Sequence, residues 1–262
     1  MGVLNVTPDS FSDGGLYFDP GRAVEQGLAM VAAGADVIDI GGESTRPGAV
    51  APTPDEERRR VIPVIRALRD QTDAWLSVDS SDPSVFRAAA DAGADLLNDV
   101  RALTRPGALS AAVACGLPVC LMHMQGTPET MQREPRYDDV VAEVFGFLRR
   151  RATECVNGGL RPGSLILDPG FGFGKNLAHN VALLRHLPDL VAGAHPVLVG
   201  LSRKSMIGGL VGEPAGQAAD RLGGSLALAL QARAAGVRMV RVHDVGLTVQ
   251  AFRVMDALED HQ

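Results

Sequence analysis

Short apolar and β-branched runs alternate along the chain with longer helical stretches, from one end to the other. The apolar runs are nearly continuous, as in Leu165-Ile166-Leu167, which is typical of parallel strands buried on both faces. Eight strands are predicted in this way, over residues 2–5, 36–40, 75–79, 95–99, 118–123, 164–168, 196–200 and 238–243.

Helix signals fall between these predicted strands. Residues 53–56 predict a capping box with proline at the first helical position, and residues 19–20 and 82–83 repeat the pairing of a cap with proline. Recurrent Ala-Gly phrases predict a left-handed glycine at the end of a helix, just before the next strand. These phrases contain Gly34, Gly93 and Gly236.

Strand and helix alternate at intervals of about 30 residues, which predicts successive βαβ units and an all-parallel sheet. An open doubly wound sheet is the alternative to a closed barrel. Eight strands is the barrel number, and no linker rich in proline, glycine or serine divides the chain. We therefore predict a single-domain α/β protein, a (β/α)₈ TIM barrel over residues 1–262.

Charge and composition narrow the class of partner. The formal net charge of -6 argues against a nucleic acid or a membrane surface, since both need a basic field. No stretch approaches the roughly 20 apolar residues of a membrane span, and no secretory signal is visible, so a cytoplasmic location is expected. The three cysteines show no zinc-binding spacing and sit in apolar company, so we expect buried thiols. They are Cys115, Cys120 and Cys155.

The carboxyl ends of the predicted strands are unusually polar. In barrels the active site lies at these ends. Asp79, Asn98 and Asp168, each taken alone, could cap the following helix, but so many polar ends converging on one mouth are hard to assign to capping alone. Two of them, Arg241 and His243, are two positions apart on a strand and therefore point the same way. The polar ends comprise Asn5, Asp79, Asn98, Asp99, His123, Asp168, Lys204, Arg241 and His243.

Three segments are expected beside this mouth: two loops that are longer than ordinary βα connections, and one glycine-rich segment placed like a nucleotide-binding loop. The loops over residues 6–18 and 41–52 are longer than usual βα loops, and long loops in compact domains are commonly functional. The glycine-rich segment 170–175 follows a strand and precedes a helix, but it fits neither the dinucleotide fingerprint nor the P-loop. A close-packed turn is the simplest interpretation, although Phe173 among the glycines could present its ring to a planar ligand.

Taken together, the motifs resemble the pattern of dihydropteroate synthases in order and spacing, over essentially the whole chain. NVTPDSFSDGG and GGESTRPGA are the most specific of them, and SVDS, NDV, LMHMQG, DPGFGFGK, GLSRKSMIG and RVHDV follow. The family condenses a 7,8-dihydropterin-6-ylmethyl diphosphate with 4-aminobenzoate and releases pyrophosphate. The resemblance further implies Mg²⁺, a homodimer and sensitivity to sulfonamide drugs.

The resemblance also assigns roles to individual residues. The pterin would be bound by Asp79, Asn98, Asp168, Lys204, Arg241, Met122 and Phe173. The diphosphate would lie against Asn5, Thr45, Arg46, Arg241 and His243, with Asn5 as the ligand of Mg²⁺. The aminobenzoate would be surrounded by Phe11, Thr45, Pro47, Phe173, Lys204 and Ser205. The catalytic set implied in this way is Lys204, Arg241, His243, Arg46 and Asp13.

The chain departs from the family pattern before its first strand, and three other functions compete with the one that the resemblance implies. Family members usually carry a further segment before the first strand, so we expect either a less covered barrel floor here or a start that is truncated relative to the native one. A pterin-dependent methyltransferase is the nearest competing function, and the STRPG and SRKS motifs argue against it. A Schiff-base aldolase that uses Lys204 and a pterin-binding paralogue without turnover are the others.

Overall fold

The computed structural model describes residues 1–7, 19–43, 52–127, 130–131, 134–213 and 221–260. All eight predicted strands are present; the first and the third have the predicted bounds, and the ends of the others lie within three residues of the prediction. They are β1 (Gly2–Asn5), β2 (Val37–Gly41), β3 (Trp75–Asp79), β4 (Leu96–Asp99), β5 (Val119–Met122), β6 (Leu165–Asp168), β7 (Leu198–Val199) and β8 (Met239–Val240).

The strands pair in parallel, in sequence order from β1 to β6, and β7 pairs with β8. Parallel bridges between Leu167 and Val197 and between Gly2 and Val242 join these two groups at both edges. Val3 donates to the Val242 carbonyl at 3.0 Å, so β1 continues the sheet beyond β8. The sheet therefore closes on itself, and the open doubly wound alternative is excluded.

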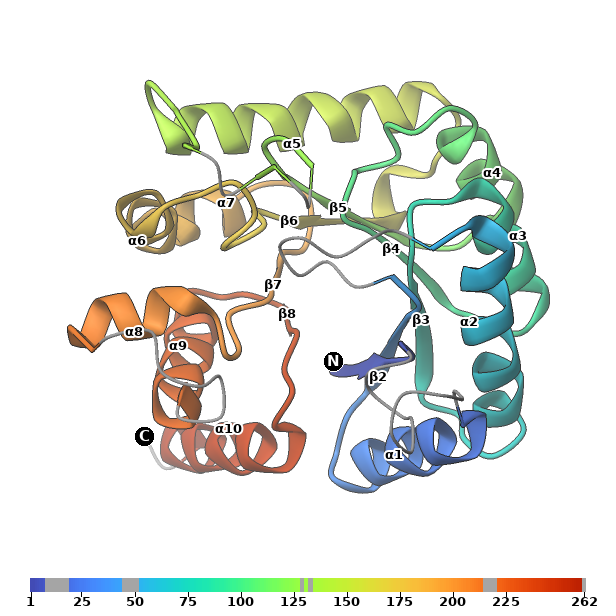
Figure 1. Ribbon diagram of the computed structural model, residues 1–262. Coiled ribbons are helices and arrows are strands. Elements are labelled where there is room, and N and C mark those ends of the chain that lie inside the picture. Colours follow the sequence, from blue (N-terminus) through green and yellow to red (C-terminus); the bar gives the residue numbers. More distant parts are fainter. Residues whose placement is uncertain (8–18, 44–51, 128–129, 132–133, 214–220, 261–262) are drawn as a thin grey trace.

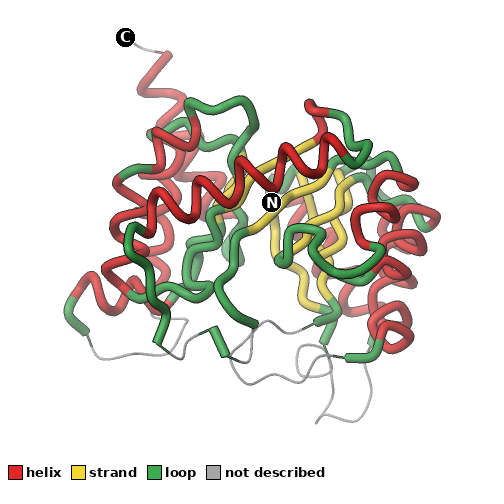
Figure 2. Tube along the Cα trace, turned by 90° about the horizontal axis from the view of Figure 1, so that it is seen from above, coloured by secondary structure: helices red, strands yellow, loops and turns green. Residues whose placement is uncertain are grey.

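Helices surround the strands (Figure 1), and in the view from above helices again lie outside the strands (Figure 2). This placement follows from right-handed βαβ crossovers, which return each helix to the outside of a closed parallel sheet. The helices are α1 (Pro20–Ala32), α2 (Pro54–Arg69), α3 (Pro83–Asp91), α4 (Ala108–Cys115), α5 (Val140–Asn157), η1 (Pro162–Ser164), α6 (Leu177–Arg185), α7 (Leu187–Val191), α8 (Ser205–Val211), α9 (Leu222–Ala234) and α10 (Val245–Asp260).

The predicted helix signals are largely confirmed. Asp19, Thr53 and Asp82 each cap a helix that has proline in its first turn. The Thr53 box is only half formed, since Thr53 accepts from the Glu56 amide while the Glu56 carboxylate pairs with Arg60. The glycines of the Ala-Gly phrases have φ values of 98°, 100° and 88°, as the left-handed caps require. They are Gly34, Gly93 and Gly236.

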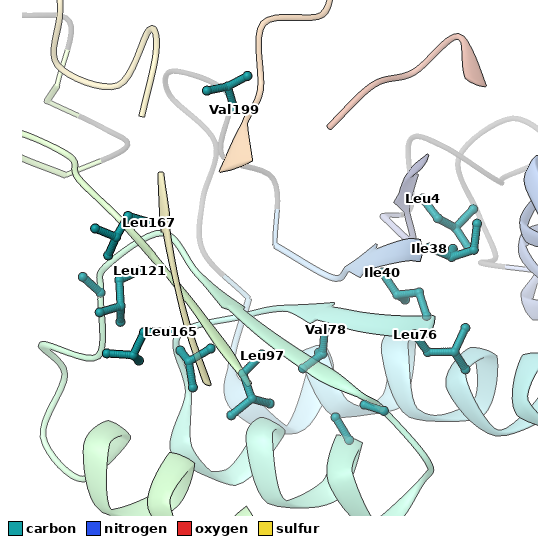
Figure 3. Close-up of a cluster of buried hydrophobic side chains, with 14 of the residues drawn as sticks. Leu4, Ile38, Ile40, Leu76, Val78, Leu97, Leu121, Leu165, Leu167 and Val199 are labelled. Carbon is teal, nitrogen blue, oxygen red and sulfur yellow. The ribbon is translucent and has the colours of Figure 1, made fainter. Parts of the chain in front are cut away.

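Two separate apolar clusters follow from the alternation of side chains along the strands. The larger cluster lies between the strands and the helices, and Figure 3 labels several of its members, among them Leu4, Ile40 and Leu167. The smaller cluster takes the opposite faces of the strands and fills the barrel interior. It contains Met1, Val37, Leu96, Cys120 and Leu198, with the half-buried Ile166 and Met239 packed against it.

The cysteines largely match the prediction of buried thiols. Cys120 and Cys155 are buried free thiols, as predicted, whereas Cys115 is only half-buried. Burial raises the pKa of all three thiols, which leaves them in the unreactive protonated form. Within the described residues, no helix is both long and apolar enough to span a membrane.

Candidate active site

A layer of four polar side chains lies directly above the apolar interior of the barrel. Each is two residues beyond a member of the interior cluster on the same strand line, so it points into the barrel as well. Alternate strands supply the four, as they do in the stacked layers of TIM barrels. This polar layer consists of Asp39, Asn98, Asp168 and Arg241.

Arg241 binds two carboxylates from neighbouring strands. Its Nε donates to Asp39 Oδ2 at 2.6 Å, and its Nη2 donates to Asp79 Oδ2 at 2.9 Å. Asn98 Nδ2 donates to the same Asp39 oxygen at 3.0 Å. Burial alone would lower the pKa of Arg241, but the carboxylates of Asp39 and Asp79 outweigh it and raise that pKa. The guanidinium therefore stays charged.

In contrast to Arg241, Asp79 has a pKa that is shifted in favour of its neutral form. Burial first, and then the negative charge of Asp39, raise its pKa to about 8, although Arg241 opposes the change. A carboxyl group with such a pKa can hold or release a proton near neutral pH. Perturbed titration of this kind, in a cluster of charges, is typical of functional sites.

Asp168 of the polar layer interacts electrostatically with Lys204. Asp168 Oδ1 accepts a hydrogen bond from the Gly170 amide at 2.7 Å. Burial raises the pKa of Asp168 to about 6 despite that hydrogen bond and the charge of Lys204. Burial lowers the pKa of Lys204 to about 8, with Asp168 opposing. Lys204 Nζ lies 4.2 Å from the centre of the Phe173 ring, a cation–π distance.

The backbone before α8 explains how Lys204 reaches this place. Arg203 adopts φ 59°, a left-handed conformation that is uncommon outside glycine. Two ionic hydrogen bonds to Asp244, at 3.1 and 2.6 Å, and one from its amide to Ser225 Oγ hold it there. The chain then enters α8 at Ser205, which is exposed, so Lys204 stands at the N-cap.

The glycine-rich segment is a close-packed turn, as the simpler interpretation expected. Gly170, Gly172 and Gly174 all have positive φ, and a side chain on Gly170 would overlap the backbone oxygen of His123. Beneath the turn, Lys175 is buried and donates to three backbone oxygens, those of Gly170 and Phe173 at 2.9 Å and that of His123 at 3.3 Å. The lysine thus fixes the turn that carries Phe173.

Lys175 also contacts the ring of a second residue of the mouth. Its Nζ lies 3.0 Å from His123 Nδ1. Burial lowers the pKa of Lys175 to about 7, while burial and the nearby ammonium lower the pKa of His123 to about 3. His123 is therefore a neutral imidazole that accepts from Lys175, and its place at the end of β5 is structural.

Three other predicted site residues lie at the strand ends. His243 Nδ1 is 3.0 Å from Ser202 Oγ, and burial, followed by Arg203 and Arg241, lowers the pKa of His243 to about 4. It therefore offers a neutral hydrogen-bonding ring rather than a positive charge. Met122 is buried at the end of β5, and Asn5 is half-buried at the end of β1.

The described residues contain no group of three or more acidic, histidine or cysteine side chains that could hold a metal ion. Asn5 supplies an amide oxygen, which is a suitable ligand for Mg²⁺. Mg²⁺ usually keeps several waters and binds one or two protein groups together with substrate phosphates. The residues present therefore fit a magnesium ion that arrives with a diphosphate.

The capping alternative is not supported for Asp79, Asn98 or Asp168. Asp99, in contrast, accepts from the backbone amides of Arg101 and Leu103 and so caps the turn after β4. Asp82 rather than Asp79 caps α3, and Asn176 rather than Asp168 caps α6 in a capping box with His179. The N-cap of α4 is Gly107, nine residues beyond Asn98. Asp79 and Asn98 make side-chain hydrogen bonds within the barrel mouth instead.

Several predicted site residues fall on parts of the chain that the structure does not describe. They are Phe11, Asp13, Thr45, Arg46 and Pro47. Conversely, two residues of the mouth received no role from the sequence, Asp39 and Lys175. For Asp39 a signal existed, because a carboxylate inside the apolar run VIDIG needs a buried partner. For Lys175 the packed glycine turn gave no comparable signal.

The fold and the site together define a class of protein. This is a barrel enzyme whose mouth presents carboxylates, an amide, a lysine and an arginine close to one another. Carboxylates and an amide oxygen accept hydrogen bonds from a donor-rich heterocycle, and an arginine face stacks well on a flat ring.

Comparison with known proteins agrees with this class. The family model described as pterin binding enzyme matches residues 1–243. The chain belongs to this family. A relative, dihydropteroate synthase of Escherichia coli (strain K12), is 52% identical over 257 residues, which cover 98% of this chain and 90% of that protein.

Solved structures of dihydropteroate synthases share the fold throughout. One from Yersinia pestis, in a sulfonamide drug complex, has 50% identity and a TM-score of 0.92, covering 99% of this chain and 93% of its own. One from Xanthomonas albilineans with 4-aminobenzoic acid has 51% identity, a TM-score of 0.92 and coverages of 98% and 92%. The Xanthomonas albilineans enzyme with 7,8-dihydropteroate has 48% identity, a TM-score of 0.88 and coverages of 98% and 92%.

Proposed function

We propose that the protein is a dihydropteroate synthase, a transferase that joins 7,8-dihydropterin-6-ylmethyl diphosphate to 4-aminobenzoate in folate biosynthesis. The observation that carries this proposal is the polar layer inside the barrel, with Lys204 and Asp79 at its rim. The relatives' complexes with 4-aminobenzoic acid and 7,8-dihydropteroate support it. Near-half identity over nearly the whole chain supports the same conclusion.

The pterin would be read by the acidic and amide side chains of the mouth. Asp168 has one oxygen occupied by the Gly170 amide, and no described residue donates to the other, which leaves it for the amidine-like edge of a pterin. Asp79 and Asn98 would meet the remaining ring nitrogens. Arg241 makes its hydrogen bonds at the edge of the guanidinium, so its flat face is available to cover the ring. Met122, Phe173 and Lys204 would form the walls.

The diphosphate would bind beside Asn5, Arg241 and His243, together with Thr45 and Arg46. Mg²⁺, bound through Asn5 and the phosphates, would supply positive charge to the leaving diphosphate. Because His243 is neutral, its contribution would be a hydrogen bond to a phosphate oxygen. Removing divalent cations with EDTA is expected to abolish turnover, and added Mg²⁺ should restore it. Undiminished turnover in excess EDTA would contradict this part of the proposal.

The aminobenzoate would be bound at the start of α8. Lys204, Ser205 and Phe173 lie there, and Phe11, Thr45 and Pro47 would complete the pocket. Sulfonamides imitate aminobenzoate in shape and charge, so we expect competitive inhibition against aminobenzoate and not against the pterin. A sulfonamide that competes only with the pterin would count against this placement.

For the chemical step we propose a dissociative substitution. The carbon–oxygen bond to the leaving diphosphate would break before the weak aniline nucleophile attacks, which leaves positive charge on the pterin methylene. Asp79, Asp168 and Asp13 would stabilise that charge, and preorganised electrostatic stabilisation of this kind usually contributes most to catalysis. A substantial secondary kinetic isotope effect on the methylene hydrogens would support this order. An effect near unity would indicate an associative displacement.

Pyrophosphate release tests the proposal directly. Purified protein should release pyrophosphate only when both substrates and Mg²⁺ are present, and each omission should reduce release to background. Methyl transfer from a methylated pterin in place of this activity would favour the methyltransferase. Pterin binding without turnover would favour a non-catalytic paralogue.

One observation also supports the Schiff-base alternative, which is the lowered pKa of Lys204. Borohydride treatment in the presence of a carbonyl substrate should leave the mass of the protein unchanged if Lys204 only binds substrate. A stable adduct on Lys204 would favour the aldolase.

A homodimer and a cytoplasmic location remain proposals. Exposed apolar side chains on α10, those of Leu247, Val254 and Leu258, support self-association, since they recur on one helix face. Light scattering should give twice the chain mass, and Leu258→Glu should reduce it to that of a monomer. A wild-type monomer would refute the proposal.

A further inference from the structure

Asp39 occupies the centre of the polar layer and is fully buried. Its Oδ2 accepts hydrogen bonds from Arg241 Nε at 2.6 Å and from Asn98 Nδ2 at 3.0 Å. Its Oδ1 has no partner among the described residues. Through this one oxygen, Asp39 on β2 links Asn98 on β4 with Arg241 at the end of β8.

The contact with Asp39 determines which end of the Asn98 amide faces a ligand. A carboxylate only accepts hydrogen bonds, so the Asn98 atom that contacts it must be the NH₂ group. The amide oxygen then points away from Asp39. No described residue donates to this oxygen, and it is not among the fully buried unpartnered atoms, so it remains accessible. The Asn98 oxygen is thereby held where it can accept from an N–H group of a bound heterocycle.

The same carboxylate fixes the plane of Arg241. Hydrogen bonds from Nε to Asp39 and from Nη2 to Asp79 hold the guanidinium at two points on different strands. A planar group held along one edge cannot rotate freely, so its face has a defined direction. Without Asp39, Arg241 would keep only the Asp79 contact and could turn about it.

We propose that Asp39 is a positioning residue for pterin recognition, which sets the Asn98 amide as an acceptor and orients the Arg241 guanidinium across the mouth. The proposal rests on the proposed function, because it assumes that the heterocycle bound there is the pterin. Asp39 itself is fully buried and acts through these two side chains.

Two substitutions separate the acceptor from the charge. Asp39→Ala removes both, so Asn98 can rotate and Arg241 loses one anchor. Asp39→Asn keeps one acceptor oxygen for Arg241 and Asn98, and its NH₂ group can take the place of Oδ1, which has no hydrogen bond to lose. The matched control is Asp95→Asn, since Asp95 also accepts from an arginine, Arg69, at 2.6 Å, but at the opposite end of β4.

The experiment measures kcat and the KM of each substrate, together with calorimetric binding of the pterin diphosphate. Asp39→Ala should raise the pterin KM and dissociation constant about tenfold or more, with the aminobenzoate KM within twofold of wild type. The pterin KM of Asp39→Asn should lie between those of Asp39→Ala and wild type, at about three times the wild-type value. Asp95→Asn should leave both KM values unchanged.

Equal rises in both KM values, or an unchanged pterin KM in a folded Asp39→Ala protein, would overturn the proposal. Should Asp39→Ala fail to fold, Asp39→Asn decides, because a pterin KM equal to that of wild type would also overturn it. Absence of pyrophosphate release by the wild type would instead refute the proposed function. The calorimetric comparison would then still test the positioning of the two side chains.

Discussion

Asp168→Asn is the substitution whose effect on pterin binding the structure defines best. The remaining oxygen of the asparagine must face the Gly170 amide, which donates to Asp168 Oδ1 at 2.7 Å. The new NH₂ group therefore has to occupy the position of Oδ2. At that position it would meet the N–H edge of the pterin, so one acceptor becomes a donor that faces another donor.

The magnitude follows from these changes. A hydrogen bond to a charged group contributes about 1.5–3 kcal/mol, and a buried donor left unsatisfied costs about 1–3 kcal/mol more. The sum is at least about 2.5 kcal/mol, which corresponds to roughly a seventyfold increase in Kd. Because Asp168 also balances the buried charge of Lys204, a loss of turnover should accompany the loss of affinity.

Isothermal titration calorimetry with a pterin, at a pH above the Asp168 pKa of about 6, measures this change. Asp189→Asn is a matched control, since Asp189 is an exposed carboxylate on α7 whose side chain contacts His186 at 3.0 Å, away from the barrel mouth. The control should bind as wild type does. Unchanged pterin affinity in a folded Asp168→Asn protein would refute the assignment of Asp168 as the pterin anchor.

Three further predictions concern charge and stability. Arg241→Lys keeps a charge but loses the planar guanidinium whose Nε and Nη2 reach Asp39 and Asp79, so kcat should fall at least about a hundredfold in the pyrophosphate assay, and near-normal turnover would contradict its role. Lys175→Met leaves three backbone oxygens without their donor and should cost about 3 kcal/mol in urea unfolding, whereas the exposed Arg161→Met should cost under about 0.5 kcal/mol. Burial raises the pKa of Glu57 to about 7, so the folded state binds more protons than the unfolded state. The contribution of Glu57 to the free energy of unfolding therefore falls as pH rises from about 4.5 through 7. Glu57→Gln should therefore gain unfolding free energy relative to wild type between pH 5 and pH 8, and an equal difference at both pH values would refute this reasoning.

The sequence alone determined the elements and their order. All eight strands, the caps at Asp19, Thr53 and Asp82, and the glycine-terminated helices are encoded in patterns that span a few residues. Such patterns act through local backbone geometry, which is why they can be predicted without knowledge of distant contacts. The polar strand ends located most residues of the mouth, and the resemblance to the family assigned their roles. The roles of residues outside the described ranges stay predictions.

Tertiary structure decided which of the polar residues meet and in what state. Arg241 and Asp39 are 202 positions apart and come into contact only when the barrel closes. Asp39 therefore looked like one residue of an apolar strand, and Lys175 like part of a glycine turn, until closure gave each its partners. The neutral imidazoles of His123 and His243 have the same origin, because burial and neighbouring cations set a pKa, and both are properties of the folded chain.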